Sequence, residues 1–260
     1  MRASSVKARR ILSLWLPRLP TDRLKRQLSG QDAAPDDAYP CVVVAKLNNA
    51  LQISALNDAA ADIGLEIGLP LANARAVCPD VQVFDVDETA DRNLLEAVAD
   101  WCDRFTPLVA LDPPYGLFLD ISGCAHLFGG EAAMLRAVCD SLDRQGFAVN
   151  AAIASTPICA RTLTRATRSC IVPDGEEARA VAPLPVFALG ADDAITRGLR
   201  RAGLKTIGDV ALRAPHEISA RFGAEFTSLL QQALGQGDAP ISPRKPLPDF
   251  MVEKRFAEPV

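Results

Sequence analysis

Short apolar strands alternate with amphipathic helices over the first 173 residues, and this alternation constrains the fold more than any other feature of the chain. The runs 41–45 and 51–55 are β-branched and typical of buried strands, whereas 88–107 has apolar residues at helical spacing. A tight hairpin is expected to turn at Pro113–Gly116. Because strands joined by so short a turn pair antiparallel, the sequence predicts an α/β (α+β) sandwich with mixed pairing. The remaining strands are expected at 11–14, 81–87, 147–155 and 170–173, and the remaining helices at 21–28, 58–64, 70–79, 129–146 and 156–167.

The pattern changes at about residue 174, where short helices follow one another between glycines and prolines. These helices are expected within four segments, 175–189, 191–203, 206–214 and 215–237. A stretch with four prolines, 238–250, is typical of a tether between domains. The last ten residues alternate like a first strand, and an isolated strand is not a stable unit. The sequence therefore predicts that the chain stops inside a further domain.

Composition excludes several classes of protein. The 260 residues are 49% hydrophobic but contain no run of about 18 apolar residues, so a transmembrane helix is not expected. Seven cysteines without a CxxC pair indicate reduced thiols in a cytoplasmic protein, and only two histidines are available for a metal. The net charge of −4 conceals a segregation, because residues 1–26 carry eight bases and one acid whereas residues 31–103 carry fourteen acids and three bases. Local basic strips of this kind are compatible with binding a polyanion and equally with an ordinary solvated surface.

Four local motifs occur in an order that resembles the Y-family DNA polymerases, the translesion enzymes built of palm, fingers, thumb and little finger. Residues 111–129 resemble the palm hairpin of that family, and residues 189–210 resemble the helix-hairpin-helix of its thumb. Residues 53–81 resemble the fingers segment, and residues 249–260 the start of the little finger. Within the superfamily, "RRILSLWLPRLPTDRL" at 9–24 is most similar to the ImuB group, which are polymerase-like proteins of bacterial mutagenesis cassettes without catalytic function.

The resemblance implies a division of the chain into parts with a small all-α, helix-hairpin-helix thumb and with most of the little finger missing. The expected parts are a palm at 9–18 and 82–173, fingers at 19–81, a helical thumb at 174–237, a linker at 238–250 and the start of a truncated little finger at 251–260.

The same resemblance places three residues where the family has catalytic carboxylates. Polymerisation uses two divalent cations held by carboxylates on rigid strand ends. The three residues are Trp15, at the position of the first aspartate, and Tyr115 and Gly116, which replace an adjacent Asp-Glu pair. In addition, Pro17 takes the next acidic position after the first aspartate. An indole cannot ligate magnesium, so Trp15 is expected to fill the apolar pocket where a metal site would lie. No catalytic residue and no cofactor are therefore expected.

Two nearby aspartates are the alternative metal ligands. Asp112 precedes the required position by three residues, and Asp120 matches a family aspartate outside the metal site. One carboxylate cannot hold two magnesium ions, and Asp120 is expected to bond to the "ISG" turn that follows it. Magnesium would be a cofactor only if relocated ligands make the chain an active nucleotidyltransferase.

Residues that hold the incoming nucleotide are replaced as well. The family's fingers helix carries a tyrosine and an arginine that meet the triphosphate, and Asp58 and Ala61 stand at these positions. An aspartate would repel a triphosphate, so nucleotide affinity is expected to be lost. Lys46 and Arg75 are the remaining cations of this segment, and nothing assigns either to a phosphate.

DNA binding is less clearly lost than catalysis or nucleotide binding. Gly190 keeps the first glycine of the thumb hairpin, whereas Asp192 replaces the second and forms with Asp193 a candidate helix N-cap. A phosphate-binding patch and a solvated helix face are equally compatible with the basic residues that follow. The candidate DNA-binding residues are Gly190, Arg197, Arg200, Arg201 and Lys205, with a second strip at Arg161, Arg165 and Arg168.

Three functions remain open. The resemblance implies a non-catalytic adaptor in DNA repair and damage-induced mutagenesis, binding primed or damaged DNA, the sliding clamp, an error-prone replicative-type polymerase and a RecA-like cassette protein, with no membrane partner. The alternatives are an active translesion polymerase with relocated metal ligands, and a protein-interaction domain that does not contact DNA.

Overall fold

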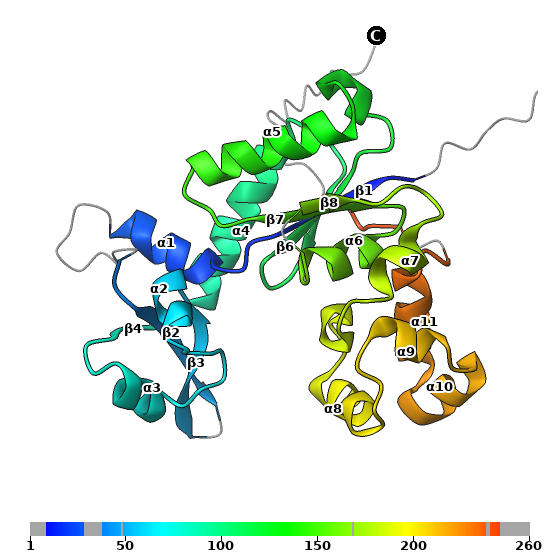
Figure 1. Ribbon diagram of the computed structural model, residues 1–260. Helices are drawn as coiled ribbons and strands as arrows, with labels where there is room; N and C mark the ends of the chain where they lie inside the picture. Colours follow the sequence, from blue (N-terminus) through cyan, green and yellow to red (C-terminus); the bar gives the residue numbers. More distant parts are fainter. Residues whose placement is uncertain (1–8, 29–37, 48, 168, 238–239, 245–260) are drawn as a thin grey trace, which may run out of the picture.

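A five-stranded sheet forms the centre of the protein (Figure 1). The structure is a computed structural model and describes residues 9–28, 38–47, 49–167, 169–237 and 240–244. Within the sheet the strands pair antiparallel except for the parallel pair β7–β8, so the expected mixed pairing is confirmed. In spatial order the strands are β5 (Val109–Asp112), β6 (Gly116–Asp120), β1 (Ile11–Trp15), β7 (Asn150–Ala154) and β8 (Ser169–Ile171).

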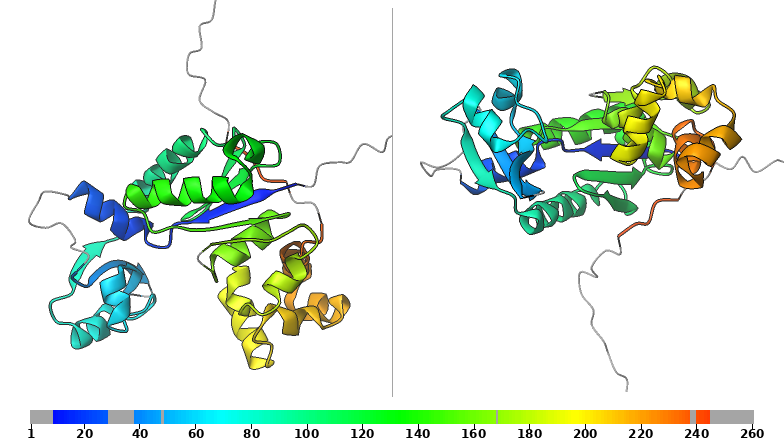
Figure 2. Two further views of the ribbon diagram at one scale, coloured as in Figure 1. Left: turned by 45° about the horizontal axis from the view of Figure 1, so that its top comes forward. Right: turned by 90° about the horizontal axis from the view of Figure 1, so that it is seen from below.

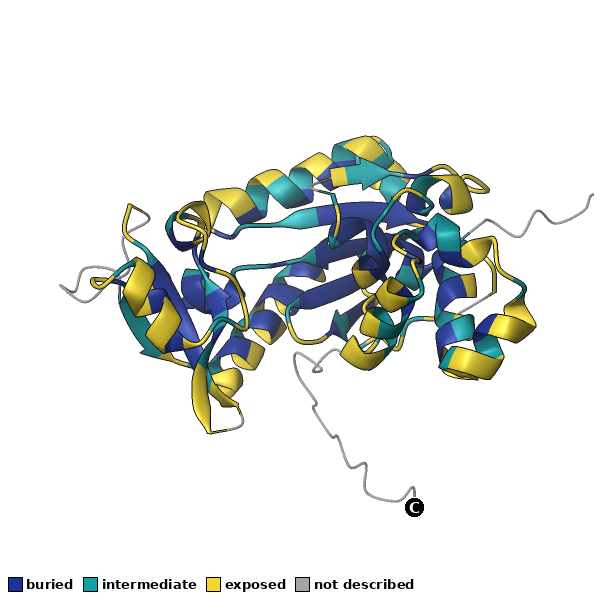
Figure 3. Cartoon of the chain, turned by 60° about the horizontal axis from the view of Figure 1, so that its bottom comes forward, coloured by how far each residue is buried: buried dark blue, intermediate teal, exposed yellow. Residues whose placement is uncertain are grey.

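Two long helices cover one face of this sheet, α4 (Glu88–Cys102) and α5 (Glu131–Arg144). Side chains along β1 point alternately to the two faces of the sheet. Leu12 and Leu14 point to the face that α4 and α5 cover and form a core with these helices. The shorter helix α6 (Pro157–Thr164) packs on the opposite face. Figure 3 shows the central strands buried between these layers, while the outer helix faces are exposed.

A second, smaller sheet carries its own core. Its strand order is β3-β2-β4, with β2 and β3 antiparallel and β2 and β4 parallel. The apolar side chains of one sheet face pack against two short helices, and those of the other face pack against a helix that follows β1. The elements are β2 (Cys41–Leu47), β3 (Ala50–Leu56), β4 (Gln82–Asp85), α1 (Leu19–Gln27), α2 (Asp58–Asp62) and α3 (Leu71–Val77).

The segment 174–237, described throughout, is helical and shares a core with α6. The sequence predicted one short helix in each of four segments, and this count was wrong. Pro183 and Pro185 divide the first segment into α7 and a 3₁₀ turn, and Gly223, at φ +91°, separates two helices in the last. The elements are α7 (Glu177–Val181), η2 (Val186–Leu189), α8 (Asp193–Arg201), α9 (Ile207–Ala211), α10 (Pro215–Phe222) and α11 (Ala224–Ala233).

The smaller sheet and the helical unit lie at opposite ends of the five-stranded sheet and project to the same side of it (Figures 1 and 2). The expected strands and helices before residue 174 are confirmed, with bounds shifted by a few residues. A 3₁₀ turn at η1 (Ala125–Phe128) was not expected. The expected boundaries between palm, fingers and thumb stay a prediction, and the start of a little finger at 251–260 lies outside the described residues.

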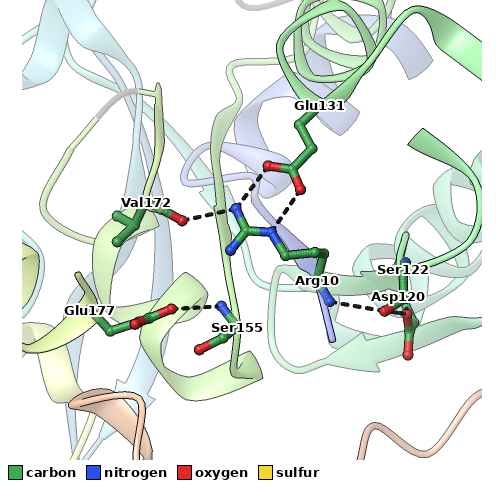
Figure 4. Close-up of polar contacts among 7 residues, drawn as sticks. All are labelled: Arg10, Asp120, Ser122, Glu131, Ser155, Val172 and Glu177. Atoms are coloured by element: carbon green, nitrogen blue, oxygen red, sulfur yellow. Dashed lines mark hydrogen bonds and ion pairs between the residues drawn. The ribbon is translucent and has the colours of Figure 1, made fainter. Parts of the chain in front are cut away.

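Arg10, just before β1, joins the sheet to α5 (Figure 4). Its guanidinium donates to both carboxylate oxygens of Glu131 at 2.7 and 2.8 Å and to the carbonyl of Val172 at 2.8 Å. Nearby, the buried carboxylate of Glu177 on α7 accepts the backbone N–H of Ser155 at 3.3 Å. The Arg10 contacts connect the start of β1, α5 and the end of β8, and the Glu177 contact connects α7 to the end of β7.

The segment 240–244 returns from the helical unit to the central sheet. Ile241 packs on a small apolar cluster of Ile11, Ala110 and Phe118, on the face opposite to α4 and α5. The backbone N–H of Arg244 donates to the carbonyl of Val109 at 2.8 Å, on the free edge of the sheet. Within the described residues, no helix is both long enough and apolar enough to cross a membrane.

Candidate functional site

Trp15 ends β1 on the face of the sheet that α4 and α5 do not cover. Leu12 and Leu14 point into the core under those helices, so the alternation of the strand turns Trp15 to the other face. The indole is half-buried, and its centroid lies 6.0 Å from that of Tyr115. The expected position at the strand end is therefore confirmed. The surroundings of the ring are not purely apolar, because the guanidinium of Arg165 lies over it.

Gly116 has no room for a side chain. It faces both Trp15 and Asp112 in the strand register. A Cβ atom at position 116 would lie 2.8 Å from the carbonyl oxygen of Asp112 and 2.9 Å from its Oδ2. The place where the resemblance puts a carboxylate is thus filled by a neighbouring residue. Beside it, the phenol of Tyr115 has a raised pKa, because it is half-buried and lies near the negative charges of Asp91 and Glu88.

Asp112 lies against Gly116, and an arginine accompanies it. We call the group of side chains around Trp15 and Gly116 the centre, and it consists of Trp15, Tyr115, Asp112, Arg161 and Arg165. Asp112 is only 7% exposed, and its Oδ1 lies 3.5 Å from Nη1 of Arg161 on α6. Burial raises the pKa of Asp112, and the positive charges of Arg161 and Arg165 oppose that shift. The second terminal nitrogen of Arg161 donates to the carbonyl of Leu189 at 3.3 Å. Arg161 therefore links the sheet to the turn that precedes α8.

Arg165 lies one helical turn further along and contacts the indole directly. Its guanidinium carbon is 5.1 Å from the centroid of the Trp15 ring, in a cation–π arrangement. The same guanidinium fills the space that a Cβ of Gly190 would need, and Gly190 has a φ of +68°. Burial and the charge of Arg161 lower the pKa of Arg165. Of the predicted basic strip, two members thus turn inward, and Arg168 lies outside the described residues.

These side chains do not fit a pair of magnesium ions. The centre has one carboxylate, Asp112, against the two guanidinium groups of Arg161 and Arg165, and the charge of the three together is positive. Hard divalent cations need several oxygen ligands and no competing cation. In the part of the chain that the structure describes, no three His, Cys, Asp or Glu side chains form a possible metal-binding group.

Asp120 is used locally. Its Oδ1 accepts the Ser122 hydroxyl at 2.6 Å and the Ser122 backbone N–H at 3.0 Å. Its Oδ2 lies 3.7 Å from Nε of Arg9. The expectation that Asp120 bonds to the following turn is confirmed, and its oxygens are engaged at the far end of β6 from Gly116.

The position expected to repel a triphosphate holds an ion pair. Asp58 opens α2, and its carboxylate lies 2.6 Å from the guanidinium of Arg18, which comes just after β1. The pair borders a hollow of about 370 Å³ between α1, α2 and the end of α5. Neighbouring Ala61 is exposed and offers no donor, and Lys46 and Arg75 are exposed on the small sheet and on α3. The charge of Asp58 is therefore largely compensated where it stands.

A separate basic surface lies on the helical unit. Asp192 occupies the N-cap position of α8, although its side chain makes no capping hydrogen bond. Leu199 anchors the helix in the core, which leaves the opposite face to solvent. Four basic side chains are exposed on α8 and its following turn, and none forms an ion pair with any residue in the described ranges: Arg197, Arg200, Arg201 and Lys205.

Sequence reasoning missed the two ion pairs that shape the centre. Asp112 and Arg161 are 49 residues apart, and Arg18 and Asp58 come from separate elements. No local spacing signals such long-range pairs. The only available signal was that Arg161 and Arg165 share a helix face with each other.

Comparison with known proteins gives a consistent family. Residues 38–165 match the model of the impB/mucB/samB family. The chain is 42% identical over 199 residues to Protein ImuB of Caulobacter vibrioides, an alignment that covers 76% of this chain and 43% of that protein. It is 28% identical over 216 residues to DNA polymerase IV of Desulfatibacillum aliphaticivorans, covering 80% and 54% of the two chains. The chain thus spans about half the length of these curated relatives or less.

Solved structures agree on the fold. The crystal structure of DinB from Sulfolobus solfataricus superposes with a TM-score of 0.70 at 14% identity, over 90% of this chain and 69% of that one. A post-insertion binary complex of Dbh DNA polymerase gives a TM-score of 0.69, also at 14% identity, over 89% and 69%. At this level of identity the likeness establishes the fold alone.

Proposed function

The chain is a Y-family polymerase-like protein of the ImuB type with an impB/mucB/samB domain, and on this premise we propose that it is a non-catalytic, DNA-binding adaptor in translesion synthesis and damage-induced mutagenesis. One observation carries the proposal. At the centre where such a fold would need carboxylates for two cations, this chain has Asp112 accompanied by Arg161 and Arg165. A centre of positive charge favours phosphate over magnesium.

The exposed face of α8 is the proposed DNA-binding surface. Arg197, Arg200, Arg201 and Lys205 are free of ion pairs within the described residues and can each meet a backbone phosphate. Gly190 positions the turn before α8, with Arg165 packed behind it. Arg161 and Arg165 then have a positioning role, because they hold this turn against the sheet.

A gel shift on primed DNA tests the DNA-binding part. The double variant Arg200→Glu/Arg201→Glu is expected to weaken binding at low salt at least tenfold and to reduce the dependence of log K on log salt by about 2. The matched control is Arg136→Glu/Arg144→Glu, which makes the same charge change on exposed positions of α5. Equal losses in the two variants, or no binding by the unaltered chain, would favour the protein-interaction domain instead.

Primer extension tests the absence of catalysis. We expect no incorporation with magnesium or with manganese, because Asp112 is compensated by arginine and Asp120 is bonded to Ser122. Incorporation that disappears in an Asp112→Ala or an Asp120→Ala variant would contradict the proposal and identify an active polymerase with relocated ligands. By relation to the ImuB type, the proposed protein partners are the sliding clamp, an error-prone replicative-type polymerase and a RecA-like cassette protein.

A further inference from the structure

Helix α4 presents an uncharged, partly exposed stripe beside its buried and acidic faces. Leu95, Val98, Ala99 and Cys102 are buried in the core. Residues spaced by three or four positions lie on one side of a helix. By this spacing one exposed side carries Glu96, Asp100 and Asp103, and another carries Ala90, Asn93, Leu94, Ala97 and Trp101. Leu94 and Trp101 are only half-buried, and Ala97 is exposed.

This stripe forms the floor of a groove. Two hollows of about 340 and 120 Å³ adjoin along α4 and share Arg26 and Leu94. The walls come from α1 on one side and from the end of α5 and its following turn on the other. We call this surface the α1–α4 groove and define it by Arg26, Leu94, Ala97, Trp101, Gln145 and Phe147.

Two arginines lie over aromatic rings at the groove. The guanidinium carbon of Arg26 is 4.1 Å from the ring centroid of Phe147, and that of Arg104 is 4.6 Å from the ring centroid of Trp101. Neither arginine forms an ion pair with a described residue. A guanidinium stacked on a ring keeps N–H groups at its rim that can donate to an anion. The groove thus offers apolar surface next to two cations that form no ion pair with a described residue.

The groove lies on the opposite side of the five-stranded sheet from the centre at Trp15. The helices α4 and α5 cover one face of the sheet, whereas Trp15 and Arg165 lie on the other with α6 (Figure 1). An occupant of the groove would therefore leave α8 and the Trp15 centre accessible. Such a separation suits a protein that holds DNA and another protein at once.

We propose that the α1–α4 groove docks an acidic amphipathic segment of a partner protein. In this arrangement an apolar side chain of the partner segment lies between Leu94 and Trp101. Carboxylates of the same segment form ion pairs with Arg26 and Arg104. Leu94 and Trp101 are seven residues apart on α4, which is about 10 Å. A partner helix with acidic residues about two turns apart around an apolar anchor matches this length. The proposal rests on the adaptor role and adds where, and with what chemistry, a partner is held.

A protein segment suits the groove better than a nucleic acid does. Single-stranded nucleic acid binds by stacking bases on free aromatic faces. Here guanidinium groups already lie over Phe147 and Trp101, and Trp101 packs edge-to-face against Phe105 at 5.2 Å. A continuous phosphate backbone along α4 would also pass its acidic side at Glu96 and Asp100. A peptide can confine its few carboxylates to the two arginines.

A random peptide library displayed on phage tests the proposal with the full chain as bait. Counter-selection uses Ala97→Arg, which places a long cation in the groove at an exposed position and so leaves the fold intact. We expect the enriched peptides to carry Asp or Glu about two turns apart around an apolar anchor. Binding of the enriched peptide, made synthetically and labelled for fluorescence anisotropy, is expected to weaken at least tenfold in Ala97→Arg and in Arg26→Glu/Arg104→Glu. Arg75→Glu/Arg136→Glu makes the same charge change at exposed positions of α3 and α5 that do not line the groove, and this charge-matched control is expected to bind normally.

Enrichment of peptides without acidic residues, or binding that Ala97→Arg leaves unchanged, would overturn the proposal. Displacement of the peptide by a single-stranded oligonucleotide, with the loss of oligonucleotide binding in Ala97→Arg, would overturn it in favour of a nucleic-acid groove. The gel shift on primed DNA separates the two proposals, because Ala97→Arg is expected to bind that DNA normally. Failure of DNA binding in the unaltered chain would affect the proposed function and not the groove.

Discussion

At the scale of single residues, Arg161 determines the electrostatics of the central site. One terminal nitrogen of its guanidinium forms an ion pair with the buried carboxylate of Asp112. The other terminal nitrogen donates to the carbonyl of Leu189. A buried carboxylate is tolerated when a cation accompanies it, and the loss of that cation leaves an uncompensated charge. The pairing thus allows Asp112 to remain beside Gly116, where no side chain would fit.

The variant Arg161→Met is therefore expected to lower the free energy of unfolding at neutral pH by about 3 kcal/mol. Burial holds the pKa of Asp112 above its usual range in the folded protein, so folding favours the protonated form. The stability that this group contributes is present at acid pH and is lost as the pH rises through the folded pKa. Without Arg161 that loss becomes larger, and urea denaturation across a pH series measures it. The double variant Asp112→Asn/Arg161→Met is expected to lack the pH dependence. A single variant as stable as the unaltered chain at neutral pH would contradict the argument.

At the scale of elements, α9 shows a helix start that is fully capped. The Thr206 hydroxyl accepts the backbone N–H of Asp209 at 3.1 Å, and the Asp209 carboxylate accepts the backbone N–H of Thr206 at 2.9 Å. These bonds, with one from the backbone of Lys205, hold the pKa of Asp209 below its usual range. The contribution of Asp209 to the stability of the folded protein is present above the usual pKa range and is lost as the pH falls through the lowered pKa.

Removing the hydroxyl in Thr206→Ala is expected to destabilise the protein by about 1 kcal/mol, because one N–H at the helix start loses its partner. Urea denaturation at neutral pH measures the change. Thr227→Ala is a matched control, since the Thr227 hydroxyl donates to the carbonyl of Gly223 on an exposed helix start and caps no N–H there. Equal effects of the two substitutions would show that the reciprocal hydrogen bonds between Thr206 and Asp209 do not stabilise the start of α9.

At the scale of the whole molecule, the segment 240–244 connects the end of the helical unit back to the sheet. Ile241 covers the apolar cluster of Ile11, Ala110 and Phe118, and the side chain of Arg244 bonds to the carbonyl of Glu96 at 2.9 Å and to the carboxylate of Asp100. The chain therefore passes from α11 across the sheet to its edge at β5. Together with the hydrogen bond between Glu177 on α7 and Ser155 after β7, this fixes the helical unit against the sheet.

Replacing the apolar contact in Ile241→Ser is expected to loosen this segment, because a serine cannot cover the apolar cluster. Trypsin cleavage after Arg244 should then become several-fold faster, as followed by mass spectrometry under native conditions. Ser242→Ala, at an exposed neighbouring position, is expected to be cleaved at the rate of the unaltered chain. Identical rates for Ile241→Ser and the unaltered chain would contradict the docking of this segment.

The sequence by itself determined the order and type of most elements and the absence of carboxylates at positions 15, 115 and 116. These properties depend on residue periodicity and on side-chain identity, which are local. The tertiary structure alone decided what stands in place of the carboxylates. Arg161 and Arg165 were predicted only as a basic strip, but the packing of α6 on the sheet turns them toward Asp112 and Trp15. The pairing of Arg18 with Asp58 and the α1–α4 groove have the same origin. They join residues that are distant along the chain, and only the packing of whole elements brings such residues together.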